Sequence, residues 1–177
     1  WEFASPQSAS SSIASINASI NATSSKSVGI EAIWPDTLLS LQKTPNDPMY
    51  SQLWGMSAIN AAGAWDSATG DKKVVVAVID TGIDLTHPDL KNNIWVNTAE
   101  TAGNDIDDDQ DGYVDDLNGW DFVDGDNNVQ DIVTFGSAGH GSHVSGTIGA
   151  EGNNNLGVVG INWNVSIMPL RICGSYG

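Results

Sequence analysis

The chain has 177 residues, which is long enough for one domain with a buried core. Its formal net charge of −16 excludes nucleic acid and anionic membranes as partners, because both require a basic surface. The single cysteine, Cys173, excludes an intrachain disulfide, and no apolar run reaches the roughly 18 residues of a membrane span.

The chain begins with a low-complexity segment. Residues 4–28 are rich in Ser, Ala, Asn and Ile and contain neither Gly nor an aromatic residue. This composition predicts a disordered linker or tail, because it offers little apolar surface to bury. A turn cluster with two prolines follows at 44–48. We therefore expect a linker over 1–43 and a folded domain over 44–177.

The first predicted elements of the folded domain are a helix and a strand. Residues 59–65 predict a short helix that ends before Gly70. Residues 74–79 form an unbroken apolar run with four valines. Its length and β-branched residues predict a strand that is buried on both faces, as in a parallel sheet.

Three further elements follow in the chain. Residues 97–131 predict loops, with one short strand at 119–123. Residues 140–150 predict a helix whose glycines require neighbouring backbone to pack very close, and residues 165–172 predict a second core strand. Strand, helix and strand in this order predict an α/β fold with a parallel sheet.

Asp80 directly follows the strand predicted at 74–79. Functional side chains gather at the carboxyl ends of strands in open α/β sheets, so Asp80 is well placed to orient a histidine. The alternative is a structural aspartate that caps the turn formed with Thr81 and Gly82. The tripeptide Asp-Thr-Gly by itself does not decide between the two.

His140 stands at the predicted N-terminus of the glycine-rich helix, and His143 lies one turn later on the same face. The helix dipole disfavours a charged imidazole at this end, so a catalytic His140 needs a carboxylate partner, which Asp80 can supply. The two histidines could instead chelate zinc, although no cluster of further Cys or His residues accompanies them. For His143 alone we favour a buried structural histidine.

The negative charge is concentrated in one stretch of the chain. Twelve acidic residues and no Lys or Arg lie between Glu100 and Asp131. Within this stretch Asp107, Asp109 and Asp111 alternate and precede a glycine, which is typical of a calcium loop. Asn118 stands where an EF-hand needs Glu, so the loop is not an EF-hand. The alternative is a solvated acidic loop.

Three blocks of sequence carry a more specific signal. They are Val-Ala-Val-Ile-Asp-Thr-Gly-Ile-Asp at 76–84, His-Pro-Asp-Leu at 87–90, and His-Gly-Ser-His-Val-Ser-Gly-Thr at 140–147. In this order they resemble the subtilisin-like serine proteases, including the thermitase-like members. The resemblance runs from Thr44 to Gly177, which is about half of a typical catalytic domain of that family.

The resemblance implies a fold and a pair of catalytic residues. It implies the N-terminal half of a three-layer α/β fold with a parallel sheet, in which Asp80 is the triad aspartate and His140 is the general base. The family's nucleophile lies in a Gly-Thr-Ser-Met-Ala-like block nearer the C-terminus, and this sequence has no such block. We therefore expect the chain to be inactive without the C-terminal half of the catalytic domain as a partner. Residues 1–43 are then a linker or the junction of propeptide and mature enzyme.

The resemblance also implies two calcium sites besides the Asp107–Asp111 loop. The stretch Gly-Trp-Asp-Phe-Val-Asp at 119–124 is similar to a calcium site of thermitase-type members, and it implies side-chain ligands Asp121, Asp124, Asp126 and Gln130. The strongest calcium position of the family implies Asp47, Asp89 and Asn154 as ligands. Calcium is therefore the expected cofactor.

The leading hypothesis for function is a secreted serine endopeptidase that acts on peptide substrates through an Asp-His-Ser triad. No basic segment precedes an apolar stretch, so any export signal is expected to lie upstream of Trp1 or to have been removed. One alternative is a calcium-binding structural or adhesion module in which the acidic loops are the function. Another is an inactive homologue of the protease family.

Overall fold

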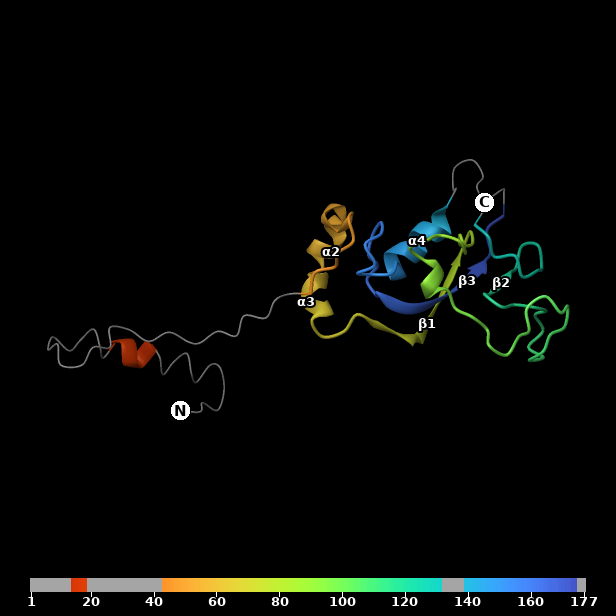
Figure 1. The fold of residues 1–177 in the computed structure, drawn as a ribbon, viewed down its shortest axis with the longest axis horizontal. Coiled ribbons are helices and arrows are strands. Elements are labelled where there is room, and N and C mark those ends of the chain that lie inside the picture. The colour runs from red at the N-terminus through yellow and green to blue at the C-terminus, as the bar shows by residue number, and fades with distance from the viewer. Residues whose placement is uncertain (1–13, 19–42, 132–138, 175–177) are drawn as a thin grey trace. The chain divides into compact units, whose positions relative to one another are not determined.

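The computed structural model describes residues 14–18, 43–131 and 139–174 (Figure 1). The chain divides into two compact units, Trp1–Leu41 and Gln42–Gly177. In the first unit residues 14–18 form a single helical turn. The rest of the linker predicted over 1–43 lies outside the described residues, except for Lys43.

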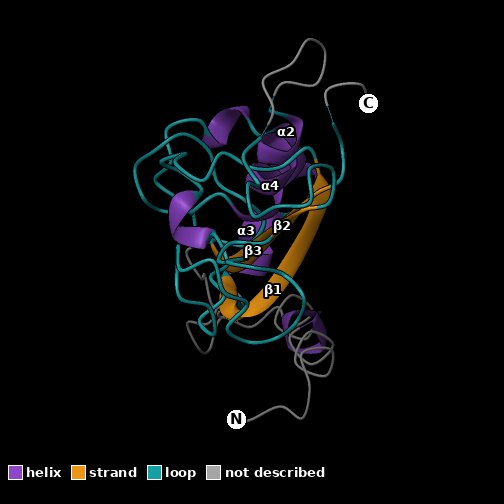
Figure 2. Ribbon diagram, turned by 90° about the vertical axis from the view of Figure 1, so that its right-hand side faces the viewer, coloured by secondary structure: helices purple, strands orange, loops and turns teal. Residues whose placement is uncertain are grey.

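The second unit is built around a three-stranded parallel sheet (Figure 2). Its strands are β1 (Gly70–Asp80), β2 (Trp120–Asp121) and β3 (Asn164–Arg171). β3 lies in the middle, between β1 and β2. The register pairs Asp80 with Arg171, so the carboxyl ends of β1 and β3 meet at one edge of the sheet. The predicted strands and their parallel arrangement are confirmed.

Helix α4 (His140–Gly149) packs on one face of the sheet (Figure 1). The core between them contains Val78, Ile83, Leu90, Val129, Ala150, Val165 and Ile167. The predicted close packing is confirmed at both ends of the helix. A Cβ atom at Gly141 would overlap the carbonyl oxygen of Gly82, and one at Gly149 would overlap the side chain of Val165. Gly146 differs, because a Cβ there would meet no atom within 4 Å.

The remaining elements are short. They are η1 (Tyr50–Gln52), α2 (Trp54–Ala58), α3 (Ala61–Trp65) and η2 (Lys91–Asn93). The helix predicted at 59–65 begins only at Ala61, because Asn60 adopts a left-handed conformation with φ of 54°. Trp65 is buried in a second core with Met56 and Trp163, and its indole N–H donates to the carbonyl oxygen of Ile161 over 2.8 Å.

The prediction that the valine-rich strand is buried on both faces is wrong for β1. Val78 is 5% exposed and faces α4, but Val75 is 45% exposed and Ile79 is 60% exposed on the opposite face. Side chains alternate across a strand, so one whole face of β1 is open. Within residues 43–131 and 139–174 no helix covers this face. Only two of the three expected layers are therefore present, the sheet and the layer that contains α4.

Candidate active site and metal centres

Asp80 and His140 form a close pair at the carboxyl edge of the sheet. Asp80 is the last residue of β1, and His140 is the first residue of α4. The Nδ1 atom of His140 lies 2.8 Å from Oδ1 and 3.0 Å from Oδ2 of Asp80. The Asp80 side chain is 14% exposed, whereas that of His140 is 61% exposed. The imidazole therefore presents its Nε2 edge away from the carboxylate.

The surroundings of Asp80 favour its ionised form. Partial burial raises the pKa of the Asp80 carboxyl, but hydrogen bonds from His140 and from the Thr81 backbone N–H outweigh that effect and hold the pKa below its ordinary value. The Thr81 N–H lies 2.7 Å from Oδ1 of Asp80. An ionised Asp80 can fix the tautomer of His140 and stabilise its charged form.

The structure corrects the expectation for His143, which is exposed rather than buried. It lines an apolar pocket of about 800 Å³ between α4 and residues 52–59, together with Trp54, Ile59 and Thr147. Neither Asp80 nor His140 lines this pocket. Among the described residues, no group of three clustered His, Cys, Asp or Glu ligands includes a histidine. The structure therefore gives no support to the zinc alternative for His140 and His143.

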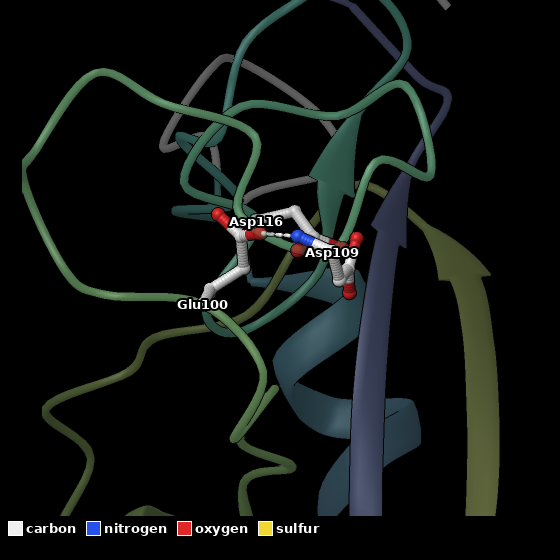
Figure 3. Close-up of side chains that lie close together, drawn as sticks. All are labelled: Glu100, Asp109 and Asp116. Carbon is white, nitrogen blue, oxygen red and sulfur yellow. Dashed lines mark hydrogen bonds between the residues drawn. The ribbon is translucent and has the colours of Figure 1, made fainter.

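The acidic loop brings more carboxylates together than the alternating motif contains. Carboxylate oxygens of Asp107, Asp109 and Asp111 all lie within 4.8 Å of one another. Asp109 belongs also to a second group, with Glu100 and Asp116 (Figure 3). The backbone folds around these side chains, because Asp107 accepts hydrogen bonds from the N–H groups of Asp111 and Gly112 at 3.1 and 2.9 Å.

Sequence reasoning missed Glu100 and Asp116 as partners of Asp109. Both are buried, at 8% and 7% exposed, and burial together with nearby Asp111 and Asp109 raises the pKa of Asp116 above its ordinary value, although a hydrogen bond from Asn97 opposes this. The only signal in the sequence was the acidity of the whole stretch. Glu100 lies nine positions before Asp109 and Asp116 lies seven positions after it, so only the loop conformation brings the three carboxylates together.

The second set of expected calcium ligands is arranged differently. The Arg171 guanidinium contacts the carboxylate of Asp121 and lies 2.8 Å from that of Asp124. Burial lowers the pKa of Arg171, but these two carboxylates outweigh burial and raise it overall. Arg171 thus supplies a positive charge beside two of the four residues. Asp126 is exposed and accepts the backbone N–H of Asn128, while Gln130 hydrogen-bonds to Asp84.

The third set is brought together around the loop that follows α4. Asp47 is 4% exposed and accepts the backbone N–H of Asn153 at 2.7 Å. Asp89 is 2% exposed, and it accepts the side-chain amide of Asn154 at 2.7 Å and the backbone N–H of Val158 at 2.9 Å. Neither Asp47 nor Asp89 forms a salt bridge with any of the described residues. Oxygen ligands without a cationic partner fit the chemistry of calcium.

The sheet, the helix and the Asp80–His140 pair define a class of protein: an α/β scaffold with a parallel sheet and a carboxylate–histidine pair at the carboxyl edge of its strands. The subtilase family profile matches residues 71–177. The chain therefore belongs to the subtilase family. Since the acidic loops are part of this α/β fold, the alternative of a separate calcium-binding module loses its support.

Named relatives agree with this assignment. The chain is 43% identical over 120 residues to subtilisin-like protease 1 of Plasmodium berghei, covering 66% of this chain and 19% of that protein. It is 37% identical over 160 residues to an extracellular protease of Xanthomonas campestris, covering 84% of this chain and 26% of that protein. The chain thus spans about a fifth to a quarter of the length of these relatives.

Solved structures show the same fold. A protease from Pseudoalteromonas arctica superposes with a TM-score of 0.55 at 30% identity, covering 76% of this chain and 40% of that one. Fervidolysin from Fervidobacterium pennivorans, a keratinolytic enzyme related to subtilisin, superposes with a TM-score of 0.50 at 27% identity, covering 77% of this chain and 17% of that one. The chain has a subtilisin-like α/β fold that covers only part of those chains. Across its described residues no helix is long and apolar enough to cross a membrane.

Proposed function

We propose that this chain supplies the aspartate and histidine of a serine endopeptidase that hydrolyses peptide bonds. The observation that carries the proposal is the contact of His140 Nδ1 with both carboxylate oxygens of Asp80, at 2.8 and 3.0 Å. This contact leaves Nε2 free to take a proton from a nucleophile. Relatives that are named proteases support the same reaction.

In the proposed reaction His140 acts as the general base. Its Nε2 accepts the proton of a serine hydroxyl as the oxygen attacks the peptide carbonyl, and it later returns that proton to the leaving amine. Asp80 stays ionised throughout, which its lowered pKa favours despite the opposing effect of burial. It holds Nδ1 protonated and stabilises the imidazolium that forms.

We propose that the nucleophile comes from the remainder of the catalytic domain, because no Gly-Thr-Ser-Met-Ala-like block occurs in the 177 residues. Two apolar surfaces of this chain support such a partner. One is the open face of β1 with Val75 and Ile79, and the other is the pocket lined by Trp54 and Ile59. Apolar surface of this extent is normally covered in a stable protein.

We propose calcium as the structural cofactor. The support is strongest at two places: the group of Asp107, Asp109 and Asp111 with Glu100 and Asp116, and the set of Asp47, Asp89 and Asn154. At the first place carboxylate oxygens converge and their like charges repel one another, which a divalent cation would relieve. At the second place two buried carboxylates without a salt bridge to any described residue lie against the loop that follows α4. Around Asp121 the support is weaker, because Arg171 already neutralises two of the carboxylates.

We propose that the protein is secreted. Relatives from Xanthomonas campestris and Dichelobacter nodosus are named extracellular proteases. A lone cysteine offers no disulfide to stabilise an exported protein, so bound calcium is a suitable substitute.

The test uses the complete protease, in which this chain is joined to the remainder of its catalytic domain. A serine-directed fluorophosphonate should label the wild-type protein on a serine outside these 177 residues. His140→Ala should abolish labelling and peptide hydrolysis, since a triad without its base loses several orders of magnitude in kcat.

His143→Gln is the matched control, because His143 lies on the same helix and does not contact Asp80, and Gln keeps a polar side chain where His143 lines the apolar pocket. It should retain labelling and hydrolysis. A wild-type protein that folds but neither labels nor hydrolyses peptides would support the inactive-homologue alternative. Activity that survives His140→Ala would overturn the proposed role of His140.

A further inference from the structure

A second aspartate lies behind the Asp80–His140 pair. Asp131 is 7% exposed, and its carboxylate accepts three hydrogen bonds. The Thr81 hydroxyl donates to Oδ1 at 2.7 Å, and the backbone N–H and the hydroxyl of Ser142 donate to Oδ2 at 2.8 and 2.6 Å. Within the described residues Asp131 has no salt bridge, so these three neutral donors are what stabilises its negative charge.

These contacts join the two segments that bear Asp80 and His140. Thr81 follows Asp80 directly and donates its backbone N–H to that carboxylate at 2.7 Å. Ser142 lies in the first turn of α4, which begins at His140. Asp131 therefore bridges the residue next to Asp80 and the residue two positions after His140.

Thr81 completes the bridge with its own hydroxyl oxygen. That oxygen accepts the backbone N–H of Gly141 at 2.9 Å while the hydroxyl proton goes to Asp131. Three donors point at the two oxygen atoms of Asp131, which is satisfied only if the group is a carboxylate that accepts all three. An amide at position 131 would turn an N–H group toward one of these donors, and a protonated carboxyl would turn an O–H group toward one.

The first turn of α4 depends on these outside partners. Gly139, at the N-cap, has no side chain with which to satisfy the free N–H groups of that turn. The N–H groups of Gly141 and Ser142 are satisfied instead by Thr81 and Asp131. A negative charge at this end also interacts favourably with the helix dipole.

We propose that Asp131 is a positioning residue, which holds the start of α4 against the Asp80–Thr81 turn so that His140 Nδ1 meets the Asp80 carboxylate. Among the described residues no hydrogen bond joins the Asp131 carboxylate to the side chain of Asp80 or His140, and its partners are Thr81 and Ser142. It acts through Thr81 and Ser142 on the separation and angle between Asp80 and His140. This inference rests on the proposed function, since it assigns a part in the same active site.

The first arm of the test measures hydrolysis by the complete protease. Asp131→Asn should lower kcat by roughly ten- to hundredfold while KM stays close to the wild-type value, because a catalytic group displaced by about 1 Å loses that much rate. Thr81→Val, which removes the bridging hydroxyl, should act in the same direction. Thr81→Ser, which keeps the hydroxyl, should restore kcat.

The second arm does not depend on activity. The proton on His140 Nδ1 is held by a carboxylate, so it should give a separate downfield resonance in the proton NMR spectrum. His140→Ala in the same complete protease assigns the resonance, because it removes this proton alone. Asp131→Asn and Thr81→Val should shift or broaden this resonance, and Thr81→Ser should not.

Asp115→Asn is the control for loss of a buried hydrogen-bonded carboxylate. Asp115 is 6% exposed and accepts the backbone N–H groups of Gly103 and Asp105 at 2.8 and 2.9 Å. Its substitution should lower the melting temperature but leave kcat and the His140 resonance unchanged. If Asp131→Asn behaves in the same way, Asp131 is only a structural cap and the inference is wrong.

The two arms separate this inference from the proposed function. A wild-type protein without hydrolytic activity would overturn the proposed function, while the His140 resonance would still report on Asp131. Full activity and an unshifted resonance in Thr81→Val would overturn the inference alone. The Thr81 pair decides the question even if Asp131→Asn does not fold, because Thr81→Val conserves side-chain volume.

Discussion

Gly141 in the first turn of α4 lies directly against Gly82 in the turn after β1, so that a methyl group on Gly141 would overlap the carbonyl oxygen of Gly82. This approach of two backbones sets how near His140 comes to Asp80. Only glycine at position 141 allows it, since the obstructing atom belongs to the main chain and cannot rotate away.

We therefore predict that Gly141→Ala moves the start of α4 away from Asp80. The complete protease should lose about 1–3 kcal/mol of stability from overpacking, and kcat should fall at least tenfold. Gly149→Ala is the control, because it overpacks the other end of the same helix against Val165. It should cost stability without a comparable fall in kcat. Equal kcat in the two variants would contradict the prediction.

The stability of the Asp80–His140 pair should depend on pH below neutrality. The folded pKa of Asp80 is lowered, since hydrogen bonds from His140 and Thr81 outweigh the raising effect of burial. Because the folded pKa is lowered, the pair stabilises the fold when the pH is above 3.8, the ordinary pKa of an aspartate. This contribution is lost as the pH falls through the folded pKa. Urea denaturation of the complete protease, as wild type and as Asp80→Asn, should be measured between about pH 6 and pH 2. The difference between their free energies of unfolding should narrow in acid. A difference that is independent of pH would refute this.

Calcium should stabilise the protein through the acidic loop. Chelation should lower the melting temperature, and calcium at a hundred times its Kd should contribute about 2.7 kcal/mol. Asp109→Asn should weaken binding most, because Asp109 belongs to both carboxylate groups. Asp105→Asn in the same loop is the control, since Asp105 is exposed and belongs to neither group. The idea fails if calorimetry detects no calcium binding to the wild-type protein.

The chain by itself should expose apolar surface. Val75 and Ile79 are 45% and 60% exposed on the open face of β1. We expect the isolated chain to bind the dye ANS and to melt without a sharp transition. Replacing both residues with Thr should reduce dye binding and should also weaken association with the remainder of the domain. Val96→Thr, at a 50% exposed site outside the strands, is the control and should change neither. A sharp cooperative melt of the isolated wild-type chain would contradict the prediction.

The sequence alone determined where the main elements lie and how Asp80 and His140 are related. A valine-rich run that ends in Asp80, and a glycine-rich run that begins with His140, predicted a strand and a helix that the structure contains at 70–80 and 140–149. Such information is local, because period, β-branching and turn residues act between neighbours in the chain.

The tertiary structure alone decided which side chains face one another. Sequence did not show that Arg171 would reach Asp121, that His143 would be exposed, or that Asp131 would bridge Thr81 and Ser142. The two contacts join residues that lie far apart in the chain, and the exposure of His143 depends on what packs against α4. Their positions follow from loop conformations and from how the layers pack, which no local pattern encodes.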